Sequence, residues 1–325
     1  MIRRHMLRRT LVIVALTALV GTGCGRIAVW AAPEKSASAE RTPAAVEADK
    51  VFWATLHGGA YDRIPAALTA LKSAYLAAPS DAVTASHVGW MHIWRLGERA
   101  RHQPVRPETT DDAVLARKYF EEAVRLDPKE ARYLGFYASL LMAEGTIHKD
   151  EKMVRRGYFT MKDAVVAWPE FNLFTAGYVF SNQPAESAQF KEGLEMQWRT
   201  LDLCSGTRVD RHNPDFGPFM HLQTQQGAKR VCWNSWIAPH NFEGFFLNMG
   251  DMLVKTGDWA TAQKVYANAK LSSTYGSWKH RAALESRIEQ AQANVAAFNA
   301  PPSKTAGDAV MMVQSRFACM GCHQE

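Results

Sequence analysis

The body of the chain repeats one arrangement of small and large apolar residues. A small residue at position i is followed by a large apolar residue at i+4, an alanine at i+7 and a proline at i+12. The matches are Ala67, Leu71, Ala74, Pro79; Ala116, Phe120, Ala123, Pro128; and Gly157, Met161, Ala164, Pro169. In a helix the first three positions share a face, where small residues let a neighbouring helix approach, and proline ends the helix. The pattern predicts the second helix of a repeated helical hairpin.

A fourth unit predicts both helices of such a hairpin, with a Gly-Asp turn between them. Its small and apolar positions are Phe246, Met249, Gly250, Leu253, Gly257, Trp259, Ala262, Tyr266 and Ala269. This unit resembles the tetratricopeptide repeat (TPR), and it departs from that family where Thr274 replaces the closing proline. The resemblance implies an all-α solenoid of TPR-like hairpins over residues 43–299, whose concave surface docks protein partners.

The spacing between units is irregular. The repeated alanines Ala74, Ala123, Ala164 and Ala269 are 49, 41 and 105 residues apart, whereas the family has a period of about 34. We therefore expect insertions near residues 101–110 and between 182 and 240, with one less regular helical pair at 169–180 and 186–203. A final apolar stripe predicts one helix that caps the array, with Leu284, Ile288, Ala291, Val295 and Phe298 on one face.

The first 31 residues have the layout of an export signal. Four arginines in the first ten residues precede a ten-residue apolar run and several small residues, and that run is shorter than the ~20 residues that span a bilayer. Cys24 follows as in a bacterial lipoprotein box, although Gly21 stands where that family has leucine. Cleavage near residues 29–31 competes and would discard Cys24. We expect a periplasmic protein, soluble or held at the membrane by a lipid on Cys24.

Composition and charge narrow the classes of function. The 325 residues are 47% hydrophobic and 22% charged, which is typical of a folded globular protein. The formal charge of +6 falls to +2 without the four leader arginines. No concentrated basic face supports nucleic-acid binding, and no paired carboxylates, nucleophile triad or phosphate loop indicates an enzyme. We expect no enzymatic activity, with a peroxidase-like activity as a third hypothesis.

The carboxyl terminus carries the strongest chemical signal. Cys319, Cys322 and His323 form C-x-x-C-H, the attachment motif of c-type haem. In this motif the two thiols form thioethers with the haem, and the imidazole is the proximal iron ligand. Cysteine is scarce, five in 325, and the export signal independently directs the chain to the compartment where such haem is attached. We expect one covalent haem c on a tail at 300–325.

Two other readings of the motif remain open. A redox-active C-x-x-C pair would normally begin a helix of a thioredoxin-like βαβ unit, and the sequence has no β-rich pattern. A zinc site would need a second pair of ligands, which only Cys204 and Cys232 could supply. In either reading the protein is a periplasmic interaction scaffold, and the motif is a minor feature of it.

The stretch before the motif resembles the start of a class I cytochrome c. Residues 307–317 predict a short amphipathic helix, but only Gln324 and Glu325 follow the motif, so the rest of that fold is missing. We expect the haem edge near the surface, on a tail hinged at Pro301 and Pro302, covered by the repeats, a second copy or another cytochrome. The conceivable distal ligands, none of which we single out, are Met220, His221, His240, Met311 and Met312.

Residues 204–240 predict a long ordered loop, rich in Gly, Pro, Asn and aromatic residues. Cys204 and Cys232 bracket it, and an oxidising compartment favours their pairing, which would stabilise the fold by roughly 3 to 4 kcal/mol. A metal site formed with His212, His221 or His240 is the alternative, although the spacings match no standard zinc pattern.

Several other residues of this region remain ambiguous from sequence. Its aromatic residues fit core packing or a cofactor pocket equally well, and they are Trp233, Trp236, Phe245 and Phe246. Lys229 and Arg230 could meet an anion or lie solvated at the surface.

The sequence as a whole predicts an exported haem protein. We expect electron transfer or haem-based sensing, with a periplasmic redox protein or another protein docked on the repeats. A homo-oligomer is compatible with this reading. The runner-up is the interaction scaffold without haem.

Overall fold

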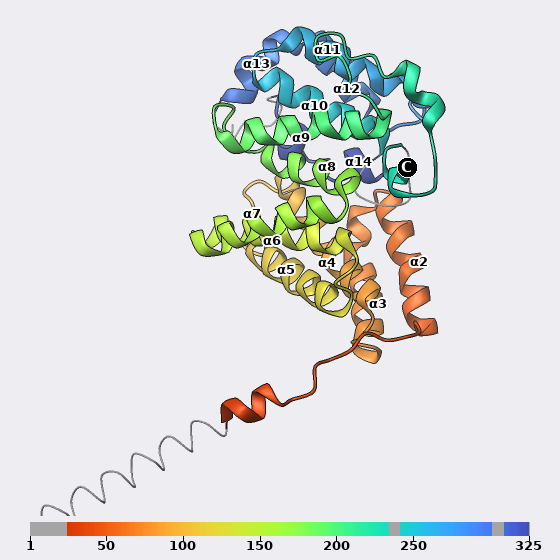
Figure 1. Ribbon diagram of the computed structural model, residues 1–325, viewed down its shortest axis with the longest axis vertical. Helices are drawn as coiled ribbons and strands as arrows, with labels where there is room; N and C mark the ends of the chain where they lie inside the picture. Colours follow the sequence, from red (N-terminus) through yellow and green to blue (C-terminus); the bar gives the residue numbers. More distant parts are fainter. Residues whose placement is uncertain (1–24, 234–240, 301–308, 325) are drawn as a thin grey trace, which may run out of the picture. The chain divides into compact units, whose positions relative to one another are not determined.

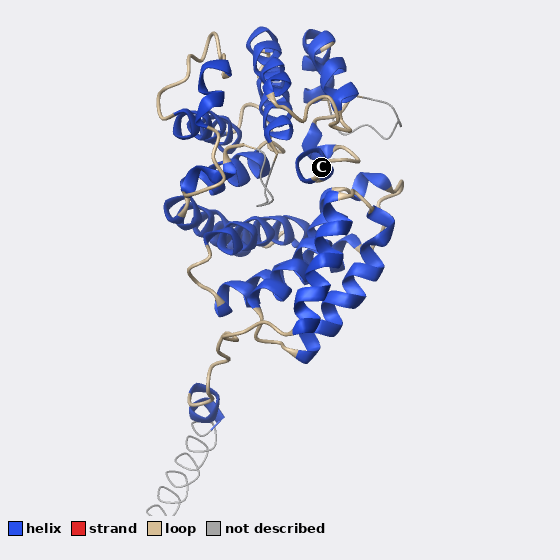
Figure 2. Ribbon diagram, turned by 90° about the vertical axis from the view of Figure 1, so that its right-hand side faces the viewer, coloured by secondary structure: helices blue, strands red, loops and turns tan. Residues whose placement is uncertain are grey.

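The computed structural model describes residues 25–233, 241–300 and 309–324, and all regular structure in these ranges is helical (Figure 2). The all-α expectation is therefore confirmed. The chain divides into two units, Met1–Ser36 and Ala37–Glu325. The described part of the first unit has a short helix at 25–30 with exposed side chains, and Cys24 lies outside the described residues. Within those residues, no helix has the length and hydropathy that crossing a membrane requires.

Successive helices of the second unit pack against each other in pairs (Figure 1). The pairs are α2 (Pro43–His57) with α3 (Ile64–Ala77), α4 (Ala82–Gly97) with α5 (Thr109–Leu126), α6 (Ala131–His148) with α7 (Glu151–Ala167), α8 (Pro169–Phe180) with α9 (Ala188–Ser205), and α10 (Phe242–Lys255) with α11 (Trp259–Asn268). Each pair also packs on the next, through α3 and α4, α5 and α6, α7 and α8, and α9 and α10.

Glycines at the helix crossings explain why these pairs pack closely. A Cβ atom on Gly89 of α4 would lie 2.7 Å from the ring of Phe120, and one on Gly250 of α10 would lie 2.2 Å from the ring of Tyr266. Phe120 and Tyr266 are the large apolar residues of the repeated pattern, and both are fully buried. Each ring therefore fills the space that the glycine of the partner helix leaves open.

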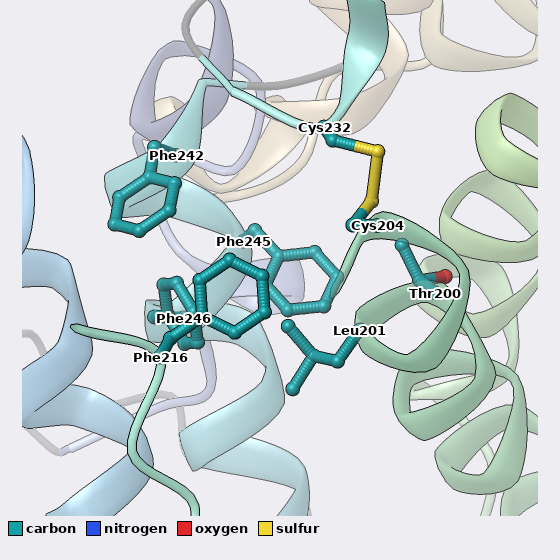
Figure 3. A pocket seen from close by; sticks show the side chains of 8 residues that line it. All are labelled: Thr200, Leu201, Cys204, Phe216, Cys232, Phe242, Phe245 and Phe246. Carbon is teal, nitrogen blue, oxygen red and sulfur yellow. A yellow bond between two sulfur atoms is a disulfide. The ribbon is translucent and has the colours of Figure 1, made fainter. Parts of the chain in front are cut away.

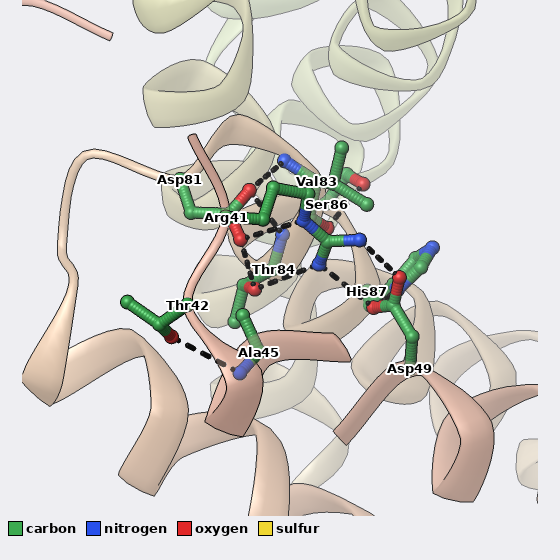
Figure 4. A network of polar contacts seen from close by, with 9 residues as sticks. All are labelled: Arg41, Thr42, Ala45, Asp49, Asp81, Val83, Thr84, Ser86 and His87. Atoms are coloured by element: carbon green, nitrogen blue, oxygen red, sulfur yellow. Dashed lines mark hydrogen bonds and ion pairs between the residues drawn. The ribbon is translucent and has the colours of Figure 1, made fainter. Parts of the chain in front are cut away.

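A polar network holds the start of the second unit against α4 (Figure 4). The guanidinium of Arg41 donates to the carboxylates of Asp49 on α2 and Asp81, the latter at 2.9 Å. Asp81 caps α4 by accepting the amide of Val83 at 3.0 Å, as an N-cap carboxylate does. Nδ1 of His87 lies 2.8 Å from Asp49, so the network ties residues 41–49 to residues 81–87.

The predicted capping helix is interrupted, and in this respect the prediction was wrong. The structure has two helices, α12 (Arg281–Glu289) and α13 (Ala291–Asn299), separated by Gln290 with φ −103° and ψ 13°. The interruption lets α12 pack on α11 while α13 packs on both α10 and α11. Leu284, Ala291 and Phe298 are still buried in one cluster, so the apolar stripe identified the packing face correctly.

The described part of the carboxyl-terminal tail joins two hydrophobic clusters. Cys319 and Met320 belong to a cluster built mainly from α2 to α6. Met311, Met312 and Cys322 belong to a second cluster, built mainly from α8 to α13. The tail therefore packs between the early and the late hairpins of the second unit.

Candidate functional site

The C-x-x-C-H motif forms one helical turn. Cys319 precedes the short helix α14 (Met320–His323), and its carbonyl oxygen accepts the amides of Cys322 at 3.1 Å and His323 at 3.0 Å. Residues three and four apart are neighbours on the surface of a helix. The backbone therefore carries Cys319, Cys322 and His323 at neighbouring positions of one turn.

A buried carboxylate anchors the beginning of this turn. Oε1 of Glu98, just after α4, accepts the amides of Cys319 at 3.1 Å and Met320 at 2.9 Å. Glu98 is fully buried, and its other oxygen accepts Nε of Arg101 at 2.5 Å. Burial raises the pKa of Glu98, whereas the Met320 amide and Arg101 oppose that rise. The carboxylate is thus satisfied on one oxygen by two amides of the tail and on the other by Arg101, three residues along the chain.

Two glycines form a cradle for the two sulfur atoms. A Cβ atom on Gly97 of α4 would lie 2.6 Å from Sγ of Cys319, and one on Gly244 of α10 would lie 2.6 Å from Sγ of Cys322. Any larger residue at either position would collide with a motif sulfur. The backbones of α4 and α10 therefore each contact one of the two thiols at a position without a side chain.

Three further hydrogen bonds fix the backbone of the motif. The hydroxyl of Tyr178 donates to the Ala318 carbonyl at 2.9 Å. Nε1 of Trp278 donates to the Gly321 carbonyl at 3.3 Å, and the amide of Asn241 donates to the Cys322 carbonyl at 2.8 Å. Donors from α8, from the segment before α12 and from the start of α10 thus converge on one short turn.

The imidazole of the motif lies against a tryptophan. The rings of His323 and Trp90 are 4.7 Å apart between centroids and meet edge to face at 71°. Such a contact restricts the rotation of the imidazole. His323 is partly exposed, whereas Cys319 and Cys322 are only 8% and 5% exposed.

Both thiols are poor acids in this setting. Burial raises the pKa of Cys319 well above its usual value, and the nearby carboxylate of Glu98 raises it further. Burial likewise raises the pKa of Cys322 strongly. A nucleophilic or redox-active cysteine instead needs a lowered pKa. The environment therefore suits thiols that are held in place or capped by a covalent bond.

The segment before the motif is not the amphipathic helix that the sequence predicts. Residues 309–311 have no regular secondary structure, and η6 (Met312–Gln314) is a single 3-10 turn. The amide of Met312 donates to the buried carboxylate of Asp251 at 2.6 Å, and the Val310 carbonyl accepts a guanidinium N–H of Arg287. Because side chains of the repeats bind these backbone groups, the segment does not need the hydrogen bonds of a helix.

The described part of the tail, residues 309–324, packs against the rest of the second unit. Met311 and Met312 have no exposed surface, and Met320 is 1% exposed. This packing removes the apolar surface of the three methionines from water, which stabilises the packed tail. Pro301 and Pro302, the expected hinge, lie outside the described residues.

The residues considered as distal iron ligands are dispersed. Sδ of Met312 lies beside Gly321, 3.0 Å from where a Cβ atom would stand. Met220 is partly buried against the late cluster. His221 is exposed and its Nδ1 lies 2.8 Å from the Pro218 carbonyl. His240 lies outside the described residues.

The described part of the long loop, residues 204–233, is held by a disulfide and by aromatic packing (Figure 3). Cys204 and Cys232 form a disulfide with Cα atoms 5.6 Å apart, the pairing expected from the sequence, so neither thiol is available to a metal. Over the ranges that the structure describes, no three His, Cys, Asp or Glu side chains gather as metal ligands would. The cavity beside the disulfide has a volume of about 10 Å³, room for about one water.

The ambiguous residues of this region have packing roles where the structure describes them. Trp233, Phe245 and Phe246 are at most 4% exposed and belong to the late cluster, which favours core packing over a cofactor pocket. The guanidinium of Arg230 lies 4.1 Å from the ring centroid of Trp168. Trp236 lies outside the described residues.

No protein-family model matches the chain, and no curated protein or solved structure is detectably similar to it. The site therefore has to be judged from its own chemistry. The two sulfurs and the imidazole are the donor set by which a c-type haem is held.

Sequence reasoning found the reactive residues of this site and missed the residues that hold them. Glu98, Gly97 and Gly244 have no local pattern that marks them. Glu98 is 221 positions from Cys319, so only the packing of the array brings them together.

Proposed function

We propose that this protein is an exported c-type haem protein, in which an array of TPR-like hairpins holds the attachment motif. The observation that carries the proposal is the placement of Cys319, Cys322 and His323 on a single turn that packs between α4 and α10. The export signal supports the same reading, because haem of this type is attached outside the cytoplasm.

In this proposal the chain's own residues have distinct roles. Cys319 and Cys322 would each hold the haem through a thioether, and His323 would hold the iron. Trp90 limits the rotation of His323, while Glu98 fixes the backbone that carries Cys319. The bound haem would supply one-electron chemistry, exchanged with a periplasmic redox protein.

The surroundings of the thiols support this reading over a dithiol redox site. Their raised pKa values keep them protonated at neutral pH, and a protonated thiol does not attack a disulfide. Their burial also denies access to a protein substrate.

A periplasmic scaffold without haem is the second candidate, and one observation favours it. The tail residues 309–324 already fill the space between the two hydrophobic clusters and need no added group to be buried. In this alternative Cys319 and Cys322 act only as apolar packing residues.

An absorption spectrum of the full chain, produced in cells with c-type haem attachment machinery, separates the two candidates. We expect the bands of a haem c, absent from the double variant Cys319→Ala, Cys322→Ala and present in Cys204→Ser, Cys232→Ser. A featureless wild-type spectrum would support the scaffold.

Two further measurements on the same sample distinguish an electron carrier from a haem-based sensor. A carrier should exchange electrons rapidly with a small periplasmic cytochrome in stopped-flow mixing and should not bind carbon monoxide. Ready binding of carbon monoxide without electron exchange would favour sensing.

A further inference from the structure

A second candidate site adjoins the segment after α4 that anchors the motif. A cavity of about 320 Å³ is lined by the end of α4, by η1 (Tyr61–Arg63), by η2 (Arg99–Arg101) and by the chain leading into α5. This volume is within the range of small-molecule sites. Nothing in the proposed function uses this cavity.

The inner lining of the cavity is cationic. Arg95, Arg99 and His102 line it and are each only partly exposed. Arg99 donates to the Leu96 carbonyl of its own turn at 3.1 Å. Among the described residues, no carboxylate oxygen lies within 4 Å of the Arg99 guanidinium. Two guanidinium groups thus face the same cavity, and one of them has no carboxylate partner in that range.

The acidic residues of the lining do not cancel this charge. Asp112 is 8% exposed, and its Oδ1 lies 2.6 Å from Nδ1 of His92 and 3.9 Å from Arg95, so its charge is already partnered. Asp62 and Glu108 are exposed, and water screens charges at such positions. The interior of the cavity therefore favours an anion.

An aromatic wall completes the cavity and connects it to the motif. The ring of Tyr61 packs edge to face on Trp94, with centroids 5.6 Å apart. The guanidinium of Arg101 lies 4.6 Å from the Tyr61 ring centroid and also donates to Glu98. A ligand against Tyr61 would therefore be two side chains away from the carboxylate that anchors Cys319.

We propose that this cavity binds a small organic carboxylate. Guanidinium groups match the planar carboxylate with paired hydrogen bonds, and Arg99 is the residue with this capacity in the interior. Tyr61 offers an apolar face to the carbon skeleton of the ligand. The proposal stands on the cavity alone and does not depend on haem attachment.

Isothermal titration of the full chain at low ionic strength tests the proposal, with succinate, inorganic phosphate and 1,4-diaminobutane as separate probes. We expect saturable binding of succinate, weaker binding of phosphate and none of the diamine. Arg99→Gln should weaken succinate binding by about tenfold or more. Arg155→Gln, exposed on α7 and paired with Glu151, is the matched control and should bind as the wild type does.

Three outcomes would overturn the proposal. They are no heat with millimolar succinate, unchanged affinity in Arg99→Gln, and phosphate or diamine binding as tight as succinate. If Arg99→Gln fails to fold by circular dichroism, Arg106→Gln at the exposed mouth of the same cavity replaces it, with weaker succinate binding expected. Unchanged affinity in that variant would also count against the site.

Discussion

Glu98 and Cys319 are 221 positions apart in the sequence, yet the carboxylate of Glu98 accepts the Cys319 amide at 3.1 Å in the interior of the second unit. The same oxygen accepts the Met320 amide. This relationship makes the carboxyl-terminal motif a part of the helical array. It also predicts that residues far from the motif control its position.

Replacing Glu98 with alanine should destabilise the fold strongly. The change leaves two buried amides without an acceptor and Arg101 without its partner, which together cost about 3 kcal/mol. Urea unfolding followed by circular dichroism measures the loss. Glu151→Ala removes an exposed carboxylate from α7 and should cost under about 0.5 kcal/mol; equal losses in the two variants would refute the anchoring role.

The close contact of two glycines with the motif sulfurs predicts that replacing either glycine with alanine destabilises the fold. Gly97→Ala and Gly244→Ala each place a methyl group 2.6 Å from a motif sulfur, so each should destabilise by about 1 to 3 kcal/mol through overpacking. Gly276→Ala, where a Cβ atom would meet nothing within 4 Å, is the control and should be nearly neutral. Thermal melts of the three variants provide the comparison, and wild-type stability in both cradle variants would contradict the close approach.

The helical array could be predicted because each hairpin has a local pattern. Ala116, Phe120 and Ala123 share a face at helical spacing, and all three have no exposed surface. Gln290 has no comparable signal. The interruption there follows from how α13 packs on α10 and α11, which is a tertiary effect.

The chemistry of the motif could be predicted, but its surroundings could not. The spacing of Cys319, Cys322 and His323 is readable from five residues. Asp251 is an ordinary helix residue in sequence, and only the fold shows that it binds the Met312 amide, the hydroxyl of Tyr266 and Arg287. Those tertiary hydrogen bonds replace the ones that an α-helix would supply to this segment.

The Asp49 network predicts a loss of stability in acid. Burial raises the pKa of Asp49, but hydrogen bonds from His87 and Arg41 outweigh it and lower the pKa from 3.8 to about 2. A carboxyl group with a lowered pKa stabilises the fold above its unfolded pKa, so this contribution is complete above about pH 4 and is lost as the pH falls toward 2. It amounts to about 2 kcal/mol at neutral pH.

Asp49→Asn tests this assignment. The variant should be less stable than the wild type at pH 7, and the difference should shrink as the pH falls from 4 toward 2. Chemical unfolding at several pH values measures both curves. A difference that stays constant over this range would mean that Asp49 contributes by packing alone.

The disulfide should stabilise the loop without affecting the motif. Cys204→Ser with Cys232→Ser opens a loop with 28 residues of separation and should cost roughly 3 to 4 kcal/mol. Dithiothreitol should lower the melting temperature of the wild type and leave that of the variant unchanged. A wild-type melt insensitive to reductant would argue against a stabilising disulfide.

Covalent haem attachment can be measured by intact-mass spectrometry under denaturing conditions, on the full chain produced with c-type haem attachment machinery. We expect the wild-type mass to exceed that of the processed polypeptide by one haem. Cys319→Ala with Cys322→Ala should lack this increment, and Glu151→Ala should retain it. A wild-type mass equal to that of the bare polypeptide, in cells that load another c-type cytochrome, would show that the protein carries no covalent haem.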